Sequence, residues 1–297
     1  MSRVDDALLR AWPLPEPDHQ GDKESRGRVL VVAGSREMPG AAVLAGLAAL
    51  RAGAGKLVVA TPLPAAPAVA AALPEARVIA LPESSAGGPL AEGLSLLQAG
   101  AGTTAAVVAG PGMLDAQATA PFALGLLEMF PAASFVLDAL ALDAVGQAGR
   151  FGAPVILTPH AGEMAHLTGI AKDEICAQPH DVALGCARRW NAIVALKGAQ
   201  TCIARPDGRC WTHEASTAGL ATSGSGDVLA GIIAGLAARG APPEQAAVWG
   251  VALHARAGER LALSQGTLGY LARELPAQVP AVMEQLAAPP PARSPGT

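Results

Sequence analysis

The segment Ser-Gly-Ser-Gly-Asp at 223–227 combines residue types that suit phosphoryl transfer. Glycines leave backbone N–H groups open to close approach, and the apolar run that follows predicts a helix whose N-terminus adds partial positive charge. Gly224, Ser225 and Gly226 could therefore form an anion hole for a transferring phosphoryl group, with Asp227 as the general base. The alternative is that Ser225 and Asp227 only cap the helix, as Ser and Asp residues commonly do.

Three other polar residues lie at or just beyond the ends of predicted strands. Lys197, one of only four lysines, precedes Gly198 and could contact phosphate or be an ordinary surface charge. His160 could contact a ligand or be a loop histidine hydrogen-bonded to the backbone, and Asp138 could touch a metal or ligand or cap the helix after it. Ligands of open parallel sheets bind outside the carboxyl ends of the strands, so binding residues are expected at these positions.

Short apolar and β-branched segments alternate with Ala/Leu-rich stretches between residues 28 and 205. Several segments are continuously apolar, as parallel strands covered on both faces should be. The strands are predicted near 28–33, 56–60, 77–81, 105–109, 134–138, 154–158, 192–197 and 201–205. After about residue 225 the pattern is helical, over 227–239, 243–264 and 267–286. The sequence thus predicts an α/β fold with an open, mostly parallel sheet and helices on both sides.

We expect a single domain over 27–286, because no internal repeat or interdomain linker interrupts this region. Residues 1–26 are polar and contain three prolines, so they are expected to form an arm on the surface. Residues 287–297 are rich in proline and cannot bury apolar area, so we expect a disordered tail there.

The composition of the 297-residue chain excludes several classes of protein. Only 15% of the residues are charged, against about 25% in an average soluble domain. The formal charge of −4 gives no overall basic character, so neither nucleic acid nor an anionic membrane is expected as a partner. An unbroken apolar stretch of about 18 residues, long enough to span a membrane, is missing. A secretory signal is missing too, which predicts a cytoplasmic protein.

Motifs of two common enzyme classes do not occur. Neither HExxH nor a G-x-x-x-x-G-K-[ST] loop is found, which excludes zincins and P-loop NTPases. The cysteines form no C-x-x-C pair and are expected to be free, buried thiols, at Cys176, Cys186, Cys202 and Cys210. The sequence therefore assigns no metal ligands.

In order along the chain, the motifs at the strand ends resemble those of the ADP-dependent NAD(P)H-hydrate dehydratase family of the ribokinase-like superfamily. The similarity extends from about residue 20 to 285. The motifs are Val32-Ala33-Gly34-Ser35 with Met38-Pro39-Gly40-Ala41-Ala42, Val108-Ala109-Gly110-Pro111-Gly112, Val136-Leu137-Asp138-Ala139, Ile156-Leu157-Thr158-Pro159-His160-x-Gly162-Glu163, Leu196-Lys197-Gly198-x-x-Thr201, the segment 221–231, and Leu253-His254. The resemblance implies a three-layer α/β/α sandwich.

The resemblance also implies a reaction. The substrate would be the S form of NADH or NADPH to which water has added across the 5,6 bond of the nicotinamide ring. The enzyme would restore the cofactor at the expense of ADP, or of ATP in its place, and would use Mg2+. With ADP the other products would be AMP and phosphate.

Site residues follow from the same resemblance. Contacts to the hydrated dinucleotide are implied for Ala41, Gly112, His160 and Asp227. Contacts to the adenine nucleotide are implied for Lys197, Gly198, Ala199, Gln200, Thr201 and Gly226. Relatives are commonly tetramers, so a homo-oligomer is expected. Many relatives carry an epimerase domain for which this chain is too short, so a separate epimerase would act on the same substrate.

Departures from the family pattern keep two alternatives open. The segment 216–220 has Thr217 where the family commonly has Asn, Ser225 replaces a usual Thr, and Leu140 follows Leu-Asp-Ala. One alternative is a ribokinase-like kinase of a small alcohol, such as a hydroxymethyl-pyrimidine, a thiazole alcohol or a vitamin, with the same base and anion hole. The other is a nucleotide sensor without turnover.

Overall fold

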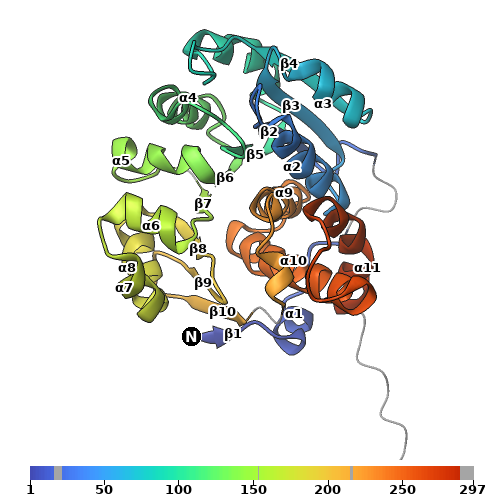
Figure 1. Ribbon diagram of the computed structural model, residues 1–297, viewed down its shortest axis with the longest axis vertical. Coiled ribbons are helices and arrows are strands. Elements are labelled where there is room, and N and C mark those ends of the chain that lie inside the picture. Colours follow the sequence, from blue (N-terminus) through green and yellow to red (C-terminus); the bar gives the residue numbers. More distant parts are fainter. Residues whose placement is uncertain (17–21, 153, 215–216, 288–297) are drawn as a thin grey trace, which may run out of the picture.

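A sheet forms the middle layer of the structure (Figure 1), a computed structural model that describes residues 1–16, 22–152, 154–214 and 217–287. In this part of the chain the sheet has ten strands, in the order β1-β10-β9-β8-β7-β6-β5-β2-β3-β4. All neighbours are parallel except β8 with β9 and β9 with β10. The strands are β1 (Ser2–Arg3), β2 (Arg28–Val32), β3 (Lys56–Pro62), β4 (Ala76–Leu81), β5 (Thr104–Ala109), β6 (Ser134–Leu137), β7 (Val155–Leu157), β8 (Ile193–Leu196), β9 (Gln200–Ala204) and β10 (Cys210–Glu214).

Helices cover both faces of this sheet, and each face has its own hydrophobic core (Figure 1). One face is covered by α1 (Asp6–Ala11), α2 (Pro39–Arg51), α3 (Ala66–Ala72), α9 (Ser225–Ala238), α10 (Pro243–Gln265) and α11 (Leu275–Ala287). The other is covered by α4 (Ala116–Met129), α5 (Ala144–Ala148), α6 (Ala161–Thr168), α7 (Lys172–Ala177) and α8 (Pro179–Trp190). The structure therefore confirms the expected α/β/α sandwich.

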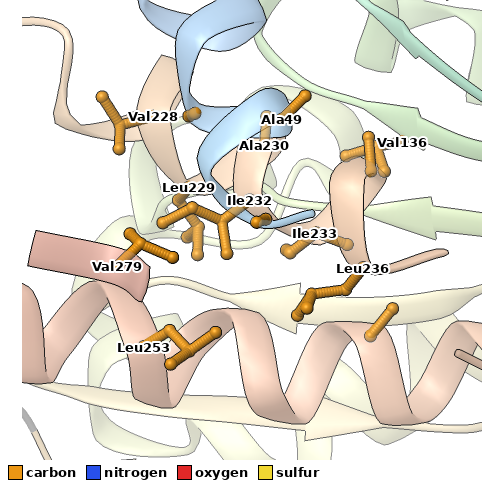
Figure 2. Close-up of a cluster of buried hydrophobic side chains, with 14 of the residues drawn as sticks. Ala49, Val136, Val228, Leu229, Ala230, Ile232, Ile233, Leu236, Leu253 and Val279 are labelled. Atoms are coloured by element: carbon orange, nitrogen blue, oxygen red, sulfur yellow. The ribbon is translucent and has the colours of Figure 1, made fainter. Parts of the chain in front are cut away.

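Helix α9 lies at the centre of the first core. Its buried aliphatic side chains contact the neighbouring layers, with Leu253 of α10 and Val279 of α11 close by (Figure 2). Burying such a side chain contributes about 1.5–3 kcal/mol. On the side of α2 the two helices approach closely: a Cβ atom on Gly231 would lie 2.2 Å from the carbonyl oxygen of Ala45. The position of α9 is thus fixed by packing along its length.

All eight predicted strands occur, and the predictions of α9 and α10 were correct to within two residues. The third predicted helix, over 267–286, was too long: α11 begins at Leu275, after a short 3-10 helix, η4 (Ala272–Glu274). Gly266 and Gly269 have φ values of 112° and 99°, which an α-helix does not contain. These glycines direct the chain away from α10 before α11 can begin.

Three elements and the exposure of one cysteine differ from the predictions. The expected N-terminal arm contains β1, which pairs with β10, and α1, in which Leu9 is buried. Strand β10 itself was not predicted. All four cysteines are free, but Cys176 is exposed while the other three are buried. The expected tail lies, from residue 288 on, outside the described residues. Among the helices that the structure describes, none is long and apolar enough to cross a membrane.

Candidate active site

Three parallel strands deliver polar side chains to one point at their carboxyl ends. Asp138 follows β6, Thr158 follows β7 and Lys197 follows β8. The Thr158 hydroxyl and the Lys197 ammonium both donate to Oδ1 of Asp138, each at 2.8 Å. Only 4% of the Asp138 side chain and 19% of the Lys197 side chain are exposed. A buried charge needs such partners, so Lys197 is no ordinary surface charge.

The first turn of α9 faces this pair. A Cβ atom on Gly226 would lie 3.4 Å from Nζ of Lys197 and 3.6 Å from Oδ2 of Asp138. The missing side chain therefore leaves backbone and charged groups within reach of a common ligand. Gly224, with φ of 84°, turns the chain into the helix in a conformation that favours glycine.

The backbone donors of this turn are not equivalent. The N–H group of Ser225 donates to the carbonyl oxygen of Thr222 at 3.2 Å. The next two N–H groups are those of Gly226 and Asp227. They precede the N–H of Val228, which donates to the carbonyl oxygen of Gly224. They belong to the part of a helix that has no intrahelical partner. Gly226 and Asp227 are thus better placed than Ser225 to donate to an anion.

Asp227 is the half-buried carboxylate of the same turn. Desolvation by burial, and then the nearby charge of Asp138, raise the pKa of Asp227 to about 6, although Lys197 opposes the change. The N-cap residue of α9 is Gly224, which has no side chain. Ser225 and Asp227 therefore lie inside the first turn and not at the N-cap position.

The Ser225 hydroxyl has another partner. It lies 2.9 Å from Nε2 of His254, a residue of α10. Desolvation lowers the pKa of His254 to about 4, so the ring is neutral at physiological pH and can accept the hydroxyl proton. His254 thereby fixes the direction of Ser225 beside the first turn of α9.

Lys197 is surrounded by carboxylates. Its Nζ lies 3.8 Å from Oε2 of Glu163 as well as 2.8 Å from Oδ1 of Asp138. Desolvation alone would lower the pKa of Lys197, but the charges of Asp138, Glu163 and Asp227 outweigh it, and the pKa is raised. The ammonium is therefore held in its charged form, as a phosphate contact requires.

His160 begins α6 and caps it. Its Nδ1 accepts from the N–H groups of Gly162 and Glu163, both at 3.0 Å, and Oε2 of Glu163 accepts from the N–H of His160 at 2.7 Å. The hydrogen bonds to backbone that the sequence offered as one alternative are thus present. The side chain is still 59% exposed and lines a cleft of about 410 Å3 that also includes Leu140.

Ala41 and Gly112 come together on the other side of Asp138. A Cβ atom on Gly112 would lie 2.4 Å from Cβ of Ala41, so the loop after β5 contacts the start of α2 directly. Gly110, two residues earlier, approaches the backbone of Asp138 so closely that its Cβ would lie 1.7 Å from the carbonyl oxygen. The loop after β5 therefore borders the same site.

The turn between β8 and β9 supplies the remaining predicted nucleotide contacts. Gly198, Ala199 and Gln200 are exposed, directly after Lys197. Thr201 is buried, and its hydroxyl donates to the carbonyl oxygen of Gly198 at 3.4 Å. In the segment that departs from the family pattern, Thr217 accepts from the N–H of Gly219, while residues 215–216 lie outside the described part of the chain.

Two acidic residues of the site were not among the predicted site residues. Asp138 stood out only as a polar residue at a strand end, and Glu163 only as the last residue of a motif. Their pairing with Lys197 joins positions up to 59 residues apart. One signal could have found Asp138 and Glu163 as it found Lys197. Each is a charged residue at the carboxyl end of one of several adjacent strands, or at the start of the helix that follows such a strand.

Known proteins are similar to this chain over most of its length. A family model described as NAD(P)H-hydrate dehydratase matches residues 29–281. An ADP-dependent (S)-NAD(P)H-hydrate dehydratase from Xanthomonas campestris pv. campestris is 49% identical over 280 residues, which cover 94% of this chain and 95% of that protein. Bifunctional NAD(P)H-hydrate repair enzymes from several organisms are also similar, and the chain spans about half the length of each.

Solved structures support the same assignment. An ADP/ATP-dependent NAD(P)H-hydrate dehydratase from Bacillus subtilis, co-crystallised with ATP and Mg2+, has a TM-score of 0.81 and 33% identity, covering 96% of this chain and 98% of its own. A ribokinase-like superfamily protein from Enterococcus faecalis, at 24% identity, has a TM-score of 0.82 over 97% of both chains, which shows the fold. This chain belongs to the NAD(P)H-hydrate dehydratase family, on a ribokinase-like fold.

Proposed function

We propose that this chain is an ADP-dependent (S)-NAD(P)H-hydrate dehydratase, which restores NADH and NADPH from their hydrated forms and converts ADP to AMP and phosphate. The observation that carries the proposal is the half-buried Asp227, with a pKa of about 6, in the same turn as Gly226 and within the electrostatic reach of Lys197. A base with this pKa is mostly ionised at neutral pH and still accepts a proton effectively. The similarity to named dehydratases over nearly the whole chain supports the same activity.

In the proposed reaction Asp227 takes the proton of the hydroxyl group at C6 of the hydrated ring. The oxygen then attacks the terminal phosphoryl group of ADP, so that a bond from phosphorus to this oxygen forms while the bond to AMP breaks. The ring nitrogen lone pair drives the departure of phosphate, and loss of the C5 proton restores the reduced ring. The residues that the protein must supply are one base and a set of positioned donors.

Lys197 and the first turn of α9 are the proposed donors to the phosphoryl group. Nζ of Lys197 and Oδ2 of Asp138 border the space that a Gly226 side chain would fill, and the N–H groups of Gly226 and Asp227 belong to the same turn. We assign the contacts to the rest of the adenine nucleotide to the residues that follow Lys197, which are the exposed Gly198, Ala199 and Gln200 and the buried Thr201. Gly224 and Ser225 complete the proposed anion hole by holding the turn in shape.

Mg2+ fits the donor chemistry of this site. Among the described residues no three His, Cys, Asp or Glu side chains could hold a metal by themselves. In phosphoryl-transfer sites, however, Mg2+ is commonly held by one or two carboxylates together with substrate phosphates. The hydrogen bonds to Asp138 reach its Oδ1, and Oδ2 faces Gly226, so Asp138 would hold the ion together with the phosphates. Bound Mg2+ would offset the negative charge of the phosphates.

Ala41, Gly112 and His160 are the proposed contacts to the hydrated dinucleotide, together with Asp227. Ala41 and Gly112 adjoin each other. His160 lines the cleft of about 410 Å3, whose lining does not include Ala41, Gly112 or Asp227. Ala41 has only a methyl side chain and Gly112 has none, so a flat ring could approach the base, Asp227. The cleft has the size of a small-molecule site.

The decisive experiment incubates the protein with hydrated NADH, Mg2+ and either ADP or ATP, and follows the absorbance of reduced nicotinamide together with free phosphate. Equal formation of NADH and phosphate is expected, and the comparison of nucleotides identifies the donor. A stable phosphate ester without NADH would indicate the alternative kinase. Nucleotide binding without any product would indicate the sensor.

A homo-oligomer in the cytoplasm, with a separate epimerase that interconverts the two forms of the hydrate, completes the proposal. Three leucines at the end of α10 and in the loop that follows are exposed: Leu263, Leu268 and Leu271. Neighbouring apolar side chains of this kind often mark a protein interface. Light scattering at micromolar concentration is expected to give a multiple of the 29.6 kDa chain mass, and a monomer would contradict the oligomer.

A further inference from the structure

A second cleft lies at the opposite ends of the strands from the candidate active site. It has a volume of about 720 Å3 and is bordered by the amino ends of β2, β3 and β4 and by the C-terminal part of α2. Its lining consists of basic and apolar side chains with a single acidic one. The lining residues that matter here are Lys23, Arg26, Arg28, Arg51, Lys56 and Arg77, with Glu75, Leu47 and Leu50.

The cleft concentrates positive charge. Its lining holds six basic residues and one acidic residue, a formal charge of +5, in a chain whose total is −4. The strand register places Arg28 directly beside Lys56, and Arg77 beside Val58, two residues further along the same strand. Like charges directly opposite each other in a sheet are destabilising. The arrangement therefore has an energetic cost unless negative charge accompanies it.

Internal carboxylates neutralise only part of this charge. Glu24 forms an ion pair with Lys56 and lies 4.0 Å from the guanidinium of Arg28. Within the described parts of the chain, Lys23, Arg26, Arg51 and Arg77 have no ion pair. These four side chains are exposed at the cleft. They remain available to an anion from solution.

The cleft also has an apolar wall. Leu47 and Leu50 are partly buried on α2 and line the same space as the basic residues. A volume of about 720 Å3 lies within the range of about 300–1,000 Å3 that small-molecule sites occupy. A ligand that fits this lining carries several negative charges at one end and a flat or apolar group at the other.

We propose that this cleft is a binding site for an organic polyphosphate of nucleotide size, separate from the site of reaction. Arginine guanidinium groups bind phosphate oxygens in pairs of parallel hydrogen bonds, and three of the four unpaired basic residues are arginines. The phosphates lie on the basic residues, and the ring lies against Leu47 and Leu50. Binding in this cleft does not depend on the dehydratase reaction.

Isothermal titration calorimetry with ATP as the probe tests this, at a salt concentration of about 0.15 M to suppress weak surface attraction. The unaltered protein is expected to bind two ATP molecules per chain. The double variant Arg51→Gln/Arg77→Gln is expected to lose at least ten-fold affinity at one of them and to keep the other. Both side chains are exposed, so the variant is expected to fold and to retain turnover with ADP.

A control variant removes the same charge elsewhere. Arg189 in α8 and Arg260 in α10 are exposed and lie outside the cleft. Arg189→Gln/Arg260→Gln is expected to bind two ATP molecules like the unaltered protein. The proposal would be overturned if no ATP affinity of the unaltered protein fell in Arg51→Gln/Arg77→Gln, or if the two double variants lost affinity equally.

Inorganic tripolyphosphate distinguishes a phosphate chain from a nucleotide. It carries three phosphates but no ring, so ATP is expected to bind the cleft at least ten-fold more tightly. Equal affinity for tripolyphosphate would refute the organic part of the proposal. Absence of turnover would refute the proposed function instead, because turnover and binding in this cleft are measured separately.

Discussion

Asp227→Asn is expected to stabilise the protein at pH 8 while it lowers kcat by about 100-fold or more through loss of the general base. The reason lies in the raised pKa of Asp227, which is about 6 in the folded protein against an ordinary value of 3.8. Between pH 3.8 and about 6 the folded state holds a proton that the unfolded state has released. Stability therefore falls as the pH rises through this range, and the full penalty persists above it.

The size of the penalty follows from the pKa. One pKa unit corresponds to about 1.4 kcal/mol, so ionised Asp227 lowers the free energy of unfolding by up to about 3 kcal/mol above pH 6. At pH 5 the penalty is about half of this. Asparagine carries no charge, so the substitution removes the penalty at both pH values. Each kcal/mol shifts Tm by about 2–4 °C in domains of 150–250 residues, so a rise of several degrees is expected at pH 8.

The assay is thermal unfolding without nucleotide at pH 5 and pH 8. The Tm difference between variant and unaltered protein is expected to be larger at pH 8. Asp173→Asn serves as the control, because Asp173 is an exposed carboxylate in the first turn of α7 and surface substitutions change stability by only about 0.5 kcal/mol. A lower Tm for Asp227→Asn at pH 8, or the same difference at both pH values, would refute the reasoning.

Three further outcomes are expected. Gly226→Ala places a Cβ 3.4 Å from Nζ of Lys197 and 3.6 Å from Oδ2 of Asp138. Steady-state kinetics should therefore show that the KM for ADP rises about ten-fold, which corresponds to about 1.4 kcal/mol. The Tm of the variant should be nearly unchanged. Gly231→Ala places a Cβ 2.2 Å from the carbonyl oxygen of Ala45, and denaturant unfolding should show a loss of about 1–3 kcal/mol; an unchanged midpoint would contradict the close packing. Removal of Mg2+ by EDTA should abolish ADP binding measured by calorimetry, and unchanged affinity would exclude a Mg2+-bound nucleotide.

The strands and central helices were predictable because buried segments are rich in apolar residues. Parallel strands covered on both faces are continuously apolar, and several of the eight predicted strands had this character, among them Val29-Leu30-Val31-Val32 and Phe135-Val136-Leu137. Strand β10, over Cys210–Glu214, contains Thr, His and Glu and lacks it. The two residues of β1 carry no pattern at all; their register with Trp211 and Thr212, and the stacking of Trp12 on Trp211 at 5.7 Å, arise from tertiary contacts.

The sequence predicted which positions belong to the site, but it did not predict which side chains contact one another there. The rule that ligands bind at the carboxyl ends of strands found Lys197 and His160. The carboxylates that hold Lys197 charged, Asp138 and Glu163, contact it only because three strands meet in space. The basic cleft was hidden for a related reason: the net charge of −4 averages over the chain and conceals a local charge of +5.

The charges of the candidate site explain why a metal ion should accompany the nucleotide. Asp138, Glu163 and Asp227 surround the single ammonium of Lys197, so carboxylates outnumber ammonium groups, and ionisation of Asp227 makes the site more negative. ADP brings further negative charge into this partly buried region, where like charges repel strongly. One lysine and the helix N-terminus cannot offset both the carboxylates and the phosphates. A divalent cation held by Asp138 would reduce this repulsion, and the carboxylates that would repel free ADP would then favour binding of its Mg2+ complex.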